Sequence, residues 1–331
     1  MNMPTHAGLA ENSQVHALSL LNKAAADELR LHILRTLRRD SFGVGELCEI
    51  FAIQQPAMSH HLKVLAQSQL VATRREGNNI FYQRAAAALQ AWLQPLNDCL
   101  FETADQLPLP APVEKRLKAI QDKRAQLSRQ FFNDNVSKFT TQQELIADYP
   151  VYATPVAELV QQLDAQQRRS VLEIGPGSGE FLAELATLFT QVIALDISEE
   201  MLNQAKTFAK AQCLKNTRFL LGDSKLALKK GINVQAIVMH MVLHHVASPA
   251  DLFADATALL TDDGHLFVAD LCEHSQDWVR QACGDLWLGF APDELSQWAL
   301  RAGLSEVREG QYFSLRNGFR LQVRHFQKST V

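Results

Sequence analysis

The chain has 331 residues and a formal net charge of −4, with 47% hydrophobic and 21% charged residues. This length is enough for two domains, and the balance is that of an ordinary globular protein. No apolar stretch reaches about 18 residues, and no basic start precedes an apolar run, so we expect neither a membrane span nor a signal peptide. The five cysteines show no C-x-x-C spacing, so we expect reduced thiols in a cytoplasmic protein.

The charge is unevenly distributed along the chain. Residues 1–97 hold 9 Lys and Arg against 7 Asp and Glu, a net +2, whereas residues 98–331 hold 23 against 29, a net −6. The mildly basic front part gives weak support for a polyanionic partner.

The front part predicts helices followed by a hairpin. After a small, polar start over 1–13, which we expect to be disordered, apolar spacing predicts a helix over 15–39. A shorter stripe predicts a second helix over 44–51, and Pro56 fits the first position of a third. The third helix is expected to bury Met58, Leu62 and Leu65. Two strands, at 70–75 and 80–84, then flank a turn of Gly and Asn that suits a tight hairpin.

This order of helix, helix, turn, helix and hairpin is a winged helix-turn-helix, and residues 17–95 resemble the ArsR family of bacterial repressors. The strongest carriers of the resemblance are QPAMSHHLKVLAQSQLV at 55–71 and RREGNNIFYQ at 74–83. The resemblance implies a double-stranded DNA operator as partner. The residues expected at the DNA are Gln55, Ala57, Ser59, His60, Lys63, Arg74, Arg75 and Asn78, with Arg84 as a further phosphate contact.

The chain departs from the family's pattern in two places. Gln54 stands where the family often has a capping Ser, and Gln is a poorer helix cap. Of the clustered cysteines of arsenic-sensing members only Cys48 remains, and one thiol cannot supply three soft ligands, so we exclude that site. His60 and His61 lie about 100° apart on a helix and do not easily face one ion. We therefore predict no metal site.

A further helix is predicted over 85–107, with apolar side chains along one side. In ArsR relatives the first and last helices of this domain pair two subunits, so the resemblance implies a homodimer on a two-fold symmetric operator. Packing within one chain is the alternative use of these helices.

The segment that follows predicts a connection between two domains. Prolines at 108–112 indicate a stiff linker, and a highly charged helix is predicted over 114–135. We therefore divide the chain into a DNA-binding and dimerisation domain at 15–105, a linker with a bridging helix at 106–130, and a second domain at 131–331.

The second domain is organised around VLEIGPGSGEF at 171–181. The apolar run predicts a buried strand, and the apolar spacing after the glycines predicts a helix. Gly175, Gly177 and Gly179 allow a tight turn and let a ligand lie against bare backbone, while the helix start favours an anionic group. The next strand ends in Asp196, about 20 residues on, where an acid can accept ribose hydroxyls.

The spacing G-x-G-x-G, preceded by Glu173, differs from the dinucleotide pattern and resembles motif I of class I S-adenosylmethionine (SAM)-dependent methyltransferases. Segments 219–224, 236–246 and 266–271 resemble that family's third, fourth and fifth strands. The resemblance covers about residues 131–331 and implies an α/β Rossmann-like fold with a mostly parallel, seven-stranded sheet. It implies SAM or S-adenosylhomocysteine (SAH) as ligand, held by Glu173, Gly175, Gly177, Gly179, Asp196, Ile197, Met201, Asp223, Ser224, Met239 and His240.

The sequence leaves open what the second domain does with its ligand. We favour a transcription regulator that responds to SAM or SAH, and the alternative is an enzyme that methylates a small organic acceptor under the control of a DNA-binding front end. Methyl transfer asks mainly for positioning, because the sulfonium of SAM already activates the methyl group. His240, His244 and His245 are candidates for a general base, and the sequence singles out none of them.

Overall fold

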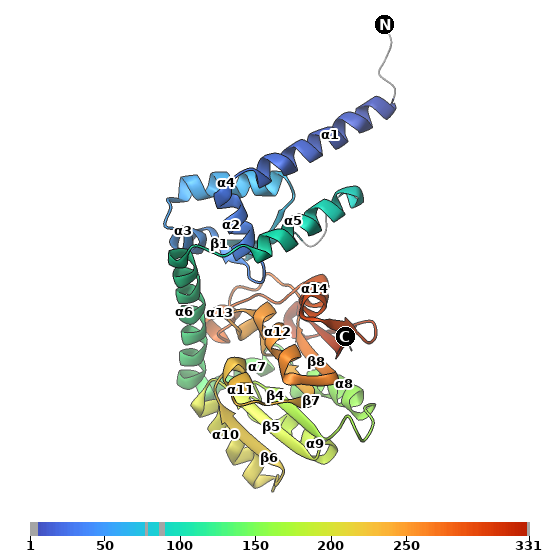
Figure 1. Ribbon diagram of the computed structural model, residues 1–331. Helices are drawn as coiled ribbons and strands as arrows, with labels where there is room; N and C mark the ends of the chain where they lie inside the picture. The colour runs from blue at the N-terminus through green and yellow to red at the C-terminus, as the bar shows by residue number, and fades with distance from the viewer. Residues whose placement is uncertain (1–5, 77–78, 86–89, 330–331) are drawn as a thin grey trace. The chain divides into compact units, whose positions relative to one another are not determined.

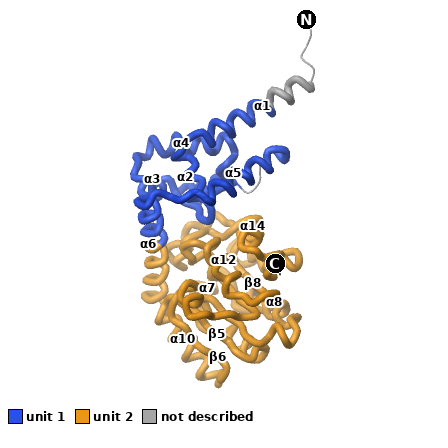
Figure 2. The backbone as a smooth tube through the Cα atoms, viewed as in Figure 1, with its two compact units in different colours: residues 1–121 blue, residues 122–331 orange. Residues whose placement is uncertain are grey.

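The structure is a computed structural model that describes residues 6–76, 79–85 and 90–329, apart from the side chains of 6–13 and 138–140. The chain divides into two compact units, residues 1–121 and 122–331 (Figure 2). The division falls inside one helix, α6 (Ala111–Asn135), so each unit holds part of that helix. Within the described ranges, none of the helices has the length and apolar character that crossing a bilayer requires.

Unit 1 combines helices with a small antiparallel sheet (Figure 1). Its helices are α1 (His6–Ala25), α2 (Glu28–Thr36), α3 (Val44–Phe51), α4 (Gln55–Gln67), the 3-10 turn η1 (Ala91–Leu93), α5 (Gln94–Gln106) and the first part of α6. The strands β1 (Phe42–Gly43), β2 (Val71–Glu76) and β3 (Asn79–Arg84) pair in the order β1-β3-β2. Helices α3 and α4 followed by β2 and β3 form the winged helix-turn-helix that the sequence predicted.

Helix α4 has one buried and one exposed side. Met58, Leu62 and Leu65 recur at helical spacing and are fully buried in the core of unit 1, as predicted. Burying each of these side chains stabilises the fold by about 1.5–3 kcal/mol. Because this side of α4 is held in the core, the opposite side of the helix faces solvent.

The predicted first helix, over 15–39, is wrong in its bounds. Asp27 interrupts it, because its side chain accepts a hydrogen bond from the Arg30 backbone N–H at 3.0 Å and so begins a new helix. The prediction of disorder over 1–13 is also wrong in part, since α1 begins at His6.

Other predicted boundaries in unit 1 shift as well. Helix α4 begins at Gln55, which puts Pro56 at its second residue rather than its first. The helix predicted over 85–107 begins only at Gln94, after η1, and its residues 86–89 lie outside the described residues. The segment expected to be a linker already contains the start of α6 at Ala111.

Unit 2 is built on a mostly parallel sheet. Its strands are β4 (Ser170–Ile174), β5 (Gln191–Asp196), β6 (Thr217–Leu221), β7 (Val234–His240), β8 (Leu260–Leu271), β9 (Leu304–Glu306), β10 (Gln311–Ser314) and β11 (Arg320–Lys328). Strands β4 to β8 pair in parallel, and β11 runs antiparallel to β8, β9 and β10. The expected seven strands are present, in the path β10-β11-β8-β7-β4-β5-β6, and the short β9 adds an eighth beside β11.

Helices cover both faces of this sheet. They are η2 (Val136–Lys138), α7 (Phe139–Glu144), α8 (Tyr149–Gln161), α9 (Glu180–Leu188), α10 (Glu199–Ala211), α11 (Ser224–Lys229), η3 (Leu243–His245), α12 (Pro249–Leu259), α13 (Val279–Ala282), α14 (Pro292–Ala302) and η4 (Arg316–Gly318). Val323 of β11 packs in one apolar cluster with α8, α9 and α10. Phe326, on the opposite face of the same strand, contacts Phe253 of α12 with ring centroids 5.9 Å apart.

Candidate functional site

The turn after β4 needs its glycines for structural reasons. Gly175, Gly177 and Gly179 have φ values of 69°, 57° and 90°, in the left-handed region that favours glycine. A Cβ atom on Gly175 would lie 2.5 Å from Cγ2 of Val242, and one on Gly179 would lie 2.9 Å from Cα of Ala205. These contacts alone explain the two glycines, so support for a ligand comes from the side chains around the turn.

The strongest such support is Glu173, on the buried strand β4. Its side chain is 2% exposed, and Oε2 has no hydrogen-bond partner among the described residues. The His240 side chain at the end of β7 lies nearby, with Nδ1 3.9 Å from Oε1 of Glu173. Neither ring nitrogen of His240 has a hydrogen-bond partner within the described part of the chain. Buried polar atoms without partners are costly, so this pair fits a polar, cationic ligand group.

Asp196 ends β5, beside the glycine turn. Its Oδ1 accepts a hydrogen bond from the Ser198 backbone N–H at 2.8 Å. Burial raises the pKa of Asp196 to about 7, against the opposing effect of hydrogen bonds from the Ser198 and Ile197 backbone. Ser198 in turn donates its hydroxyl to Oδ1 of Asn133 at 2.7 Å, which links this end of β5 to α6.

The other predicted cofactor residues lie around the same end of the sheet. Met201 and Met239 are buried, and Ile197 is half-buried. Asp223 is exposed and begins α11, where its Oδ1 accepts a hydrogen bond from the Leu226 N–H at 2.9 Å. Ser224 donates its hydroxyl to Asp255 at 2.6 Å. In the folded chain, Asp223 therefore already caps α11, and Ser224 already donates a hydrogen bond to Asp255.

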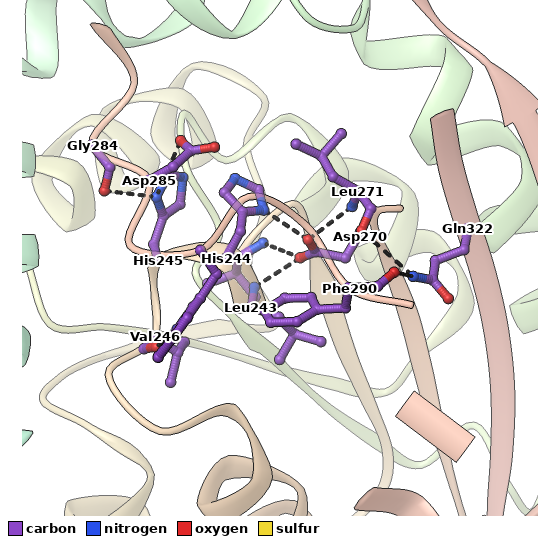
Figure 3. A network of polar contacts seen from close by, with 12 residues as sticks. Leu243, His244, His245, Val246, Asp270, Leu271, Gly284, Asp285, Phe290 and Gln322 are labelled. Carbon is purple, nitrogen blue, oxygen red and sulfur yellow. Dashed lines mark hydrogen bonds and ion pairs between the residues drawn. The ribbon is translucent and has the colours of Figure 1, made fainter. Parts of the chain in front are cut away.

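The adjacent histidines after β7 belong to a buried polar network (Figure 3). Nδ1 of His244 lies 2.7 Å from Oδ1 of Asp270, whose Oδ2 accepts hydrogen bonds from the Val242 and Leu243 backbone at 3.1 and 2.8 Å. Burial lowers the pKa of His244, but the charges of Asp270 and Asp285 outweigh this and raise it to about 9. Burial and the charge of His244 hold the pKa of His245 well below its usual value. The pKa values of these adjacent histidines are therefore shifted in opposite directions.

The predicted DNA-binding residues of α4 share its exposed side. Gln55, Ala57, Ser59, His60 and Lys63 are all exposed. The residue before the helix, Gln54, makes no side-chain cap, as expected. His61 is half-buried, with Nδ1 3.6 Å from Oδ1 of Asp27, so it does not join His60 on that side.

The hairpin arginines do not all lie where the sequence predicted. Arg75 is exposed, but Arg74 is buried and pairs with the buried Glu76 at 2.7 Å. Arg84 is buried as well, and it donates to the Leu34 carbonyl at 2.7 Å and to Asp105 at 2.6 Å. These positions do not support the prediction that Arg74 and Arg84 contact phosphate. Asn78 lies outside the described residues.

Two side chains near the site were not singled out from the sequence. Asn133, in the charged helix, bonds Ser198, and Asp285 lies beside His245, with Oδ1 3.8 Å from Nδ1. Neither belongs to a local motif, and each partner is about 40 residues or more away in the chain, so no pattern could have indicated these contacts.

Comparison with known proteins agrees with this geometry. The model of the family described as a methyltransferase domain matches residues 147–317, more than half of the chain, and that described as bacterial regulatory protein, arsR family, matches residues 27–73. The arsenical resistance operon repressor of Staphylococcus aureus is 39% identical over 94 residues, covering 27% of this chain and 84% of the repressor.

The rear of the chain is similar to proteins of another class. The ubiquinone biosynthesis O-methyltransferase of Coxiella burnetii is 26% identical over 168 residues, covering 46% of this chain and 71% of that enzyme. The crystal structure of the [4+2]-cyclase SpnF shares the fold, with a TM-score of 0.50 at 12% identity, covering 61% of this chain and 95% of SpnF. The chain therefore belongs to the methyltransferase-domain family, and it carries in front of that domain the DNA-binding domain of an ArsR-family bacterial regulator.

Proposed function

We propose that this protein is an operator-binding transcription regulator of the cytoplasm whose methyltransferase domain binds SAM or SAH and thereby changes operator affinity. The observation that carries the proposal is the buried Glu173, whose Oε2 lacks a partner among the described residues beside the glycine turn. The amino group of the methionine moiety would supply the missing cationic donor, directly or through water.

The remaining cofactor contacts follow from the same end of the sheet. Asp196 would accept the ribose hydroxyls, because its carboxylate ends β5 and the Ser198 N–H already holds Oδ1 in place. Met201 and Met239 offer buried apolar surface, while Asp223 and Ser224 are proposed for the adenine edge. When bound, SAM supplies a methyl group activated by its sulfonium.

The DNA-binding part of the proposal rests on the exposed side of α4. Its polar side chains would reach base edges, and Lys63 and Arg75 would contact phosphates. Large apolar side chains at the ends of unit 1 support a homodimer: Val15 and Leu18 of α1, Trp92 of η1 and Leu96 of α5 are all exposed. Covering them with a second copy would match the two-fold symmetry of an operator.

The path from ligand to DNA is proposed to be α6. Its front half is held to unit 1, since Arg116 donates to the Ile50 carbonyl at 2.7 Å and Gln121 to Asp40 at 2.6 Å. Its rear half is held through Asn133 to Ser198, next to the proposed ribose site. A ligand bound at this site would change the contacts of α6 at Asn133. It would shift operator affinity only if it binds the DNA-competent state and the incompetent state with different affinities.

The alternative is an active methyltransferase for a small organic acceptor. The likeness to an O-methyltransferase and the buried histidine network after β7 favour this reading. The two readings differ in whether SAM is converted to SAH, so an experiment can separate them.

The test uses the full chain and a DNA duplex selected from a random-sequence library by binding to it. Fluorescence anisotropy measures operator affinity without ligand, with SAM and with SAH. A change of at least about fivefold with either ligand is expected, which corresponds to the smallest typical coupling between sites. Equal operator affinity in all three conditions, together with binding of both ligands in calorimetry, would refute ligand-responsive regulation. Release of SAH from SAM with a phenolic acceptor would instead support the enzyme.

A further inference from the structure

Three side chains that can bind metal meet in unit 2 outside the glycine turn. His244 and His245 of η3 and Asp285 of the loop after α13 are all buried. Each offers one ligand atom, and these three atoms lie within 4.8 Å of one another (Figure 3). We call these residues the His-His-Asp cluster.

Asp285 is the least satisfied member of the cluster. Its side chain is fully buried, and neither carboxylate oxygen has a hydrogen-bond partner among the described residues. The turn that carries it is held in place, because Gly284 has φ 78° and a Cβ there would lie 2.3 Å from the Phe131 ring. A rigid turn thus holds a buried carboxylate without donors beside His245, an arrangement whose cost a cation removes.

His244 is oriented as metal-binding histidines are. Its Nδ1 lies 2.7 Å from Oδ1 of Asp270, so the ring donates from Nδ1, and Nε2 becomes the ligand atom when a metal ion displaces its proton. Asp270 is itself fixed, because its two oxygens accept hydrogen bonds from the backbone of Val242, Leu243 and Leu271. A carboxylate behind a ligating imidazole is the usual outer support of a zinc site.

We propose that the His-His-Asp cluster binds one divalent transition-metal ion of the zinc class through two imidazole nitrogens and one carboxylate oxygen. This donor set suits Zn²⁺. Tetrahedral bonds of about 2.1 Å place two ligands of one ion about 3.4 Å apart, so ligand atoms that now lie within 4.8 Å of one another move closer together on binding. Three protein ligands leave a coordination position for an oxygen ligand. The proposed metal binding does not depend on whether the domain transfers a methyl group.

Sequence patterns alone do not indicate this site and predict no metal. The argument against two adjacent histidines holds on a regular α-helix. In the 3-10 turn η3, however, the rings of His244 and His245 lie with centroids 4.0 Å apart, and Asp285 comes from a distant loop.

The experiment is a Co²⁺ titration of the full chain after chelator treatment, followed by visible absorption, with Zn²⁺ as competitor. One Co²⁺ per chain with ligand-field bands that Zn²⁺ removes is expected. Asp285→Asn should weaken Co²⁺ binding at least about 100-fold, because it removes a charged ligand. Asp277→Asn is the matched control: that carboxylate is exposed and paired with Arg280 at 3.2 Å, so binding should be unchanged.

Absence of the bands, or equal Co²⁺ affinity of Asp285→Asn and the parent, would overturn the proposal. Far-UV circular dichroism checks that each variant is folded, and His245→Gln serves as a second variant. If neither folds, X-ray absorption of the Zn²⁺-loaded parent decides: two imidazoles with light-atom ligands support the site, and a sulfur ligand or a lack of imidazole refutes it.

Discussion

Replacing Glu173 with Gln should weaken binding of both SAM and SAH. The change keeps an acceptor of the same shape but removes the charge of a side chain that is 2% exposed, beside the glycine turn. A buried hydrogen bond to a charged group contributes about 1.5–3 kcal/mol. At about 1.4 kcal/mol per factor of ten, the dissociation constants should rise about 10- to 150-fold.

Isothermal titration calorimetry of the full chain measures this change. Glu158→Gln is the matched control, because it removes the same charge from an exposed position on α8 and should leave binding unaltered. The midpoint temperature of thermal unfolding without ligand should not fall for Glu173→Gln, since the change removes a buried charge and its desolvation cost. A Glu173→Gln protein that is folded and binds SAM as tightly as the parent would refute the role assigned to this carboxylate.

Three further outcomes are expected. Because burial raises the pKa of Asp196 to about 7 and ribose hydroxyls require the ionised form, SAM affinity of the parent relative to Asp196→Asn should rise about tenfold from pH 6 to pH 8; a constant ratio in calorimetry would contradict this. Lys63→Ala should lower operator affinity and reduce the slope of log affinity against log salt by about 1, as measured by anisotropy; an unchanged slope would remove Lys63 from the phosphate contacts. Arg74→Ala should instead destabilise unit 1 by about 3–5 kcal/mol in denaturant unfolding, because it removes the guanidinium that pairs with the buried Glu76 carboxylate, and a change in salt slope with unaltered stability would reverse this assignment.

Local patterns were sufficient for much of this molecule. The buried stripe of α4 and the turn of Gly175 to Gly179 can each be predicted from a few neighbouring residues, because helical spacing and left-handed φ values constrain amino-acid type directly. The mostly parallel character of the sheet in unit 2 was expected from resemblance to a known family, and the observed sheet agrees with it.

Contacts between distant segments could not be predicted in this way. Arg74 and Arg84 looked like phosphate contacts, since a basic residue on a hairpin is usually exposed. Arg84 pairs with Asp105 in α5, a helix whose start was itself misplaced, whereas Arg74 pairs with Glu76 on its own strand. Sequence periodicity describes one element at a time, whereas the pairing of Arg84 depends on how elements pack.

The order of strands in unit 2 has a consequence for synthesis of the chain. Strand β8 lies between β7 and β11, and β11 is made after β8, almost 50 residues further along the chain. Until the ribosome has added residues 320–328, one edge of β8, whose residues 266–271 are mostly apolar, has no partner and can pair with another chain. Unit 1, with its ArsR-type domain, emerges before unit 2 and can fold while that edge is still open. A stalled or truncated product would therefore combine a working DNA-binding domain with an aggregation-prone sheet.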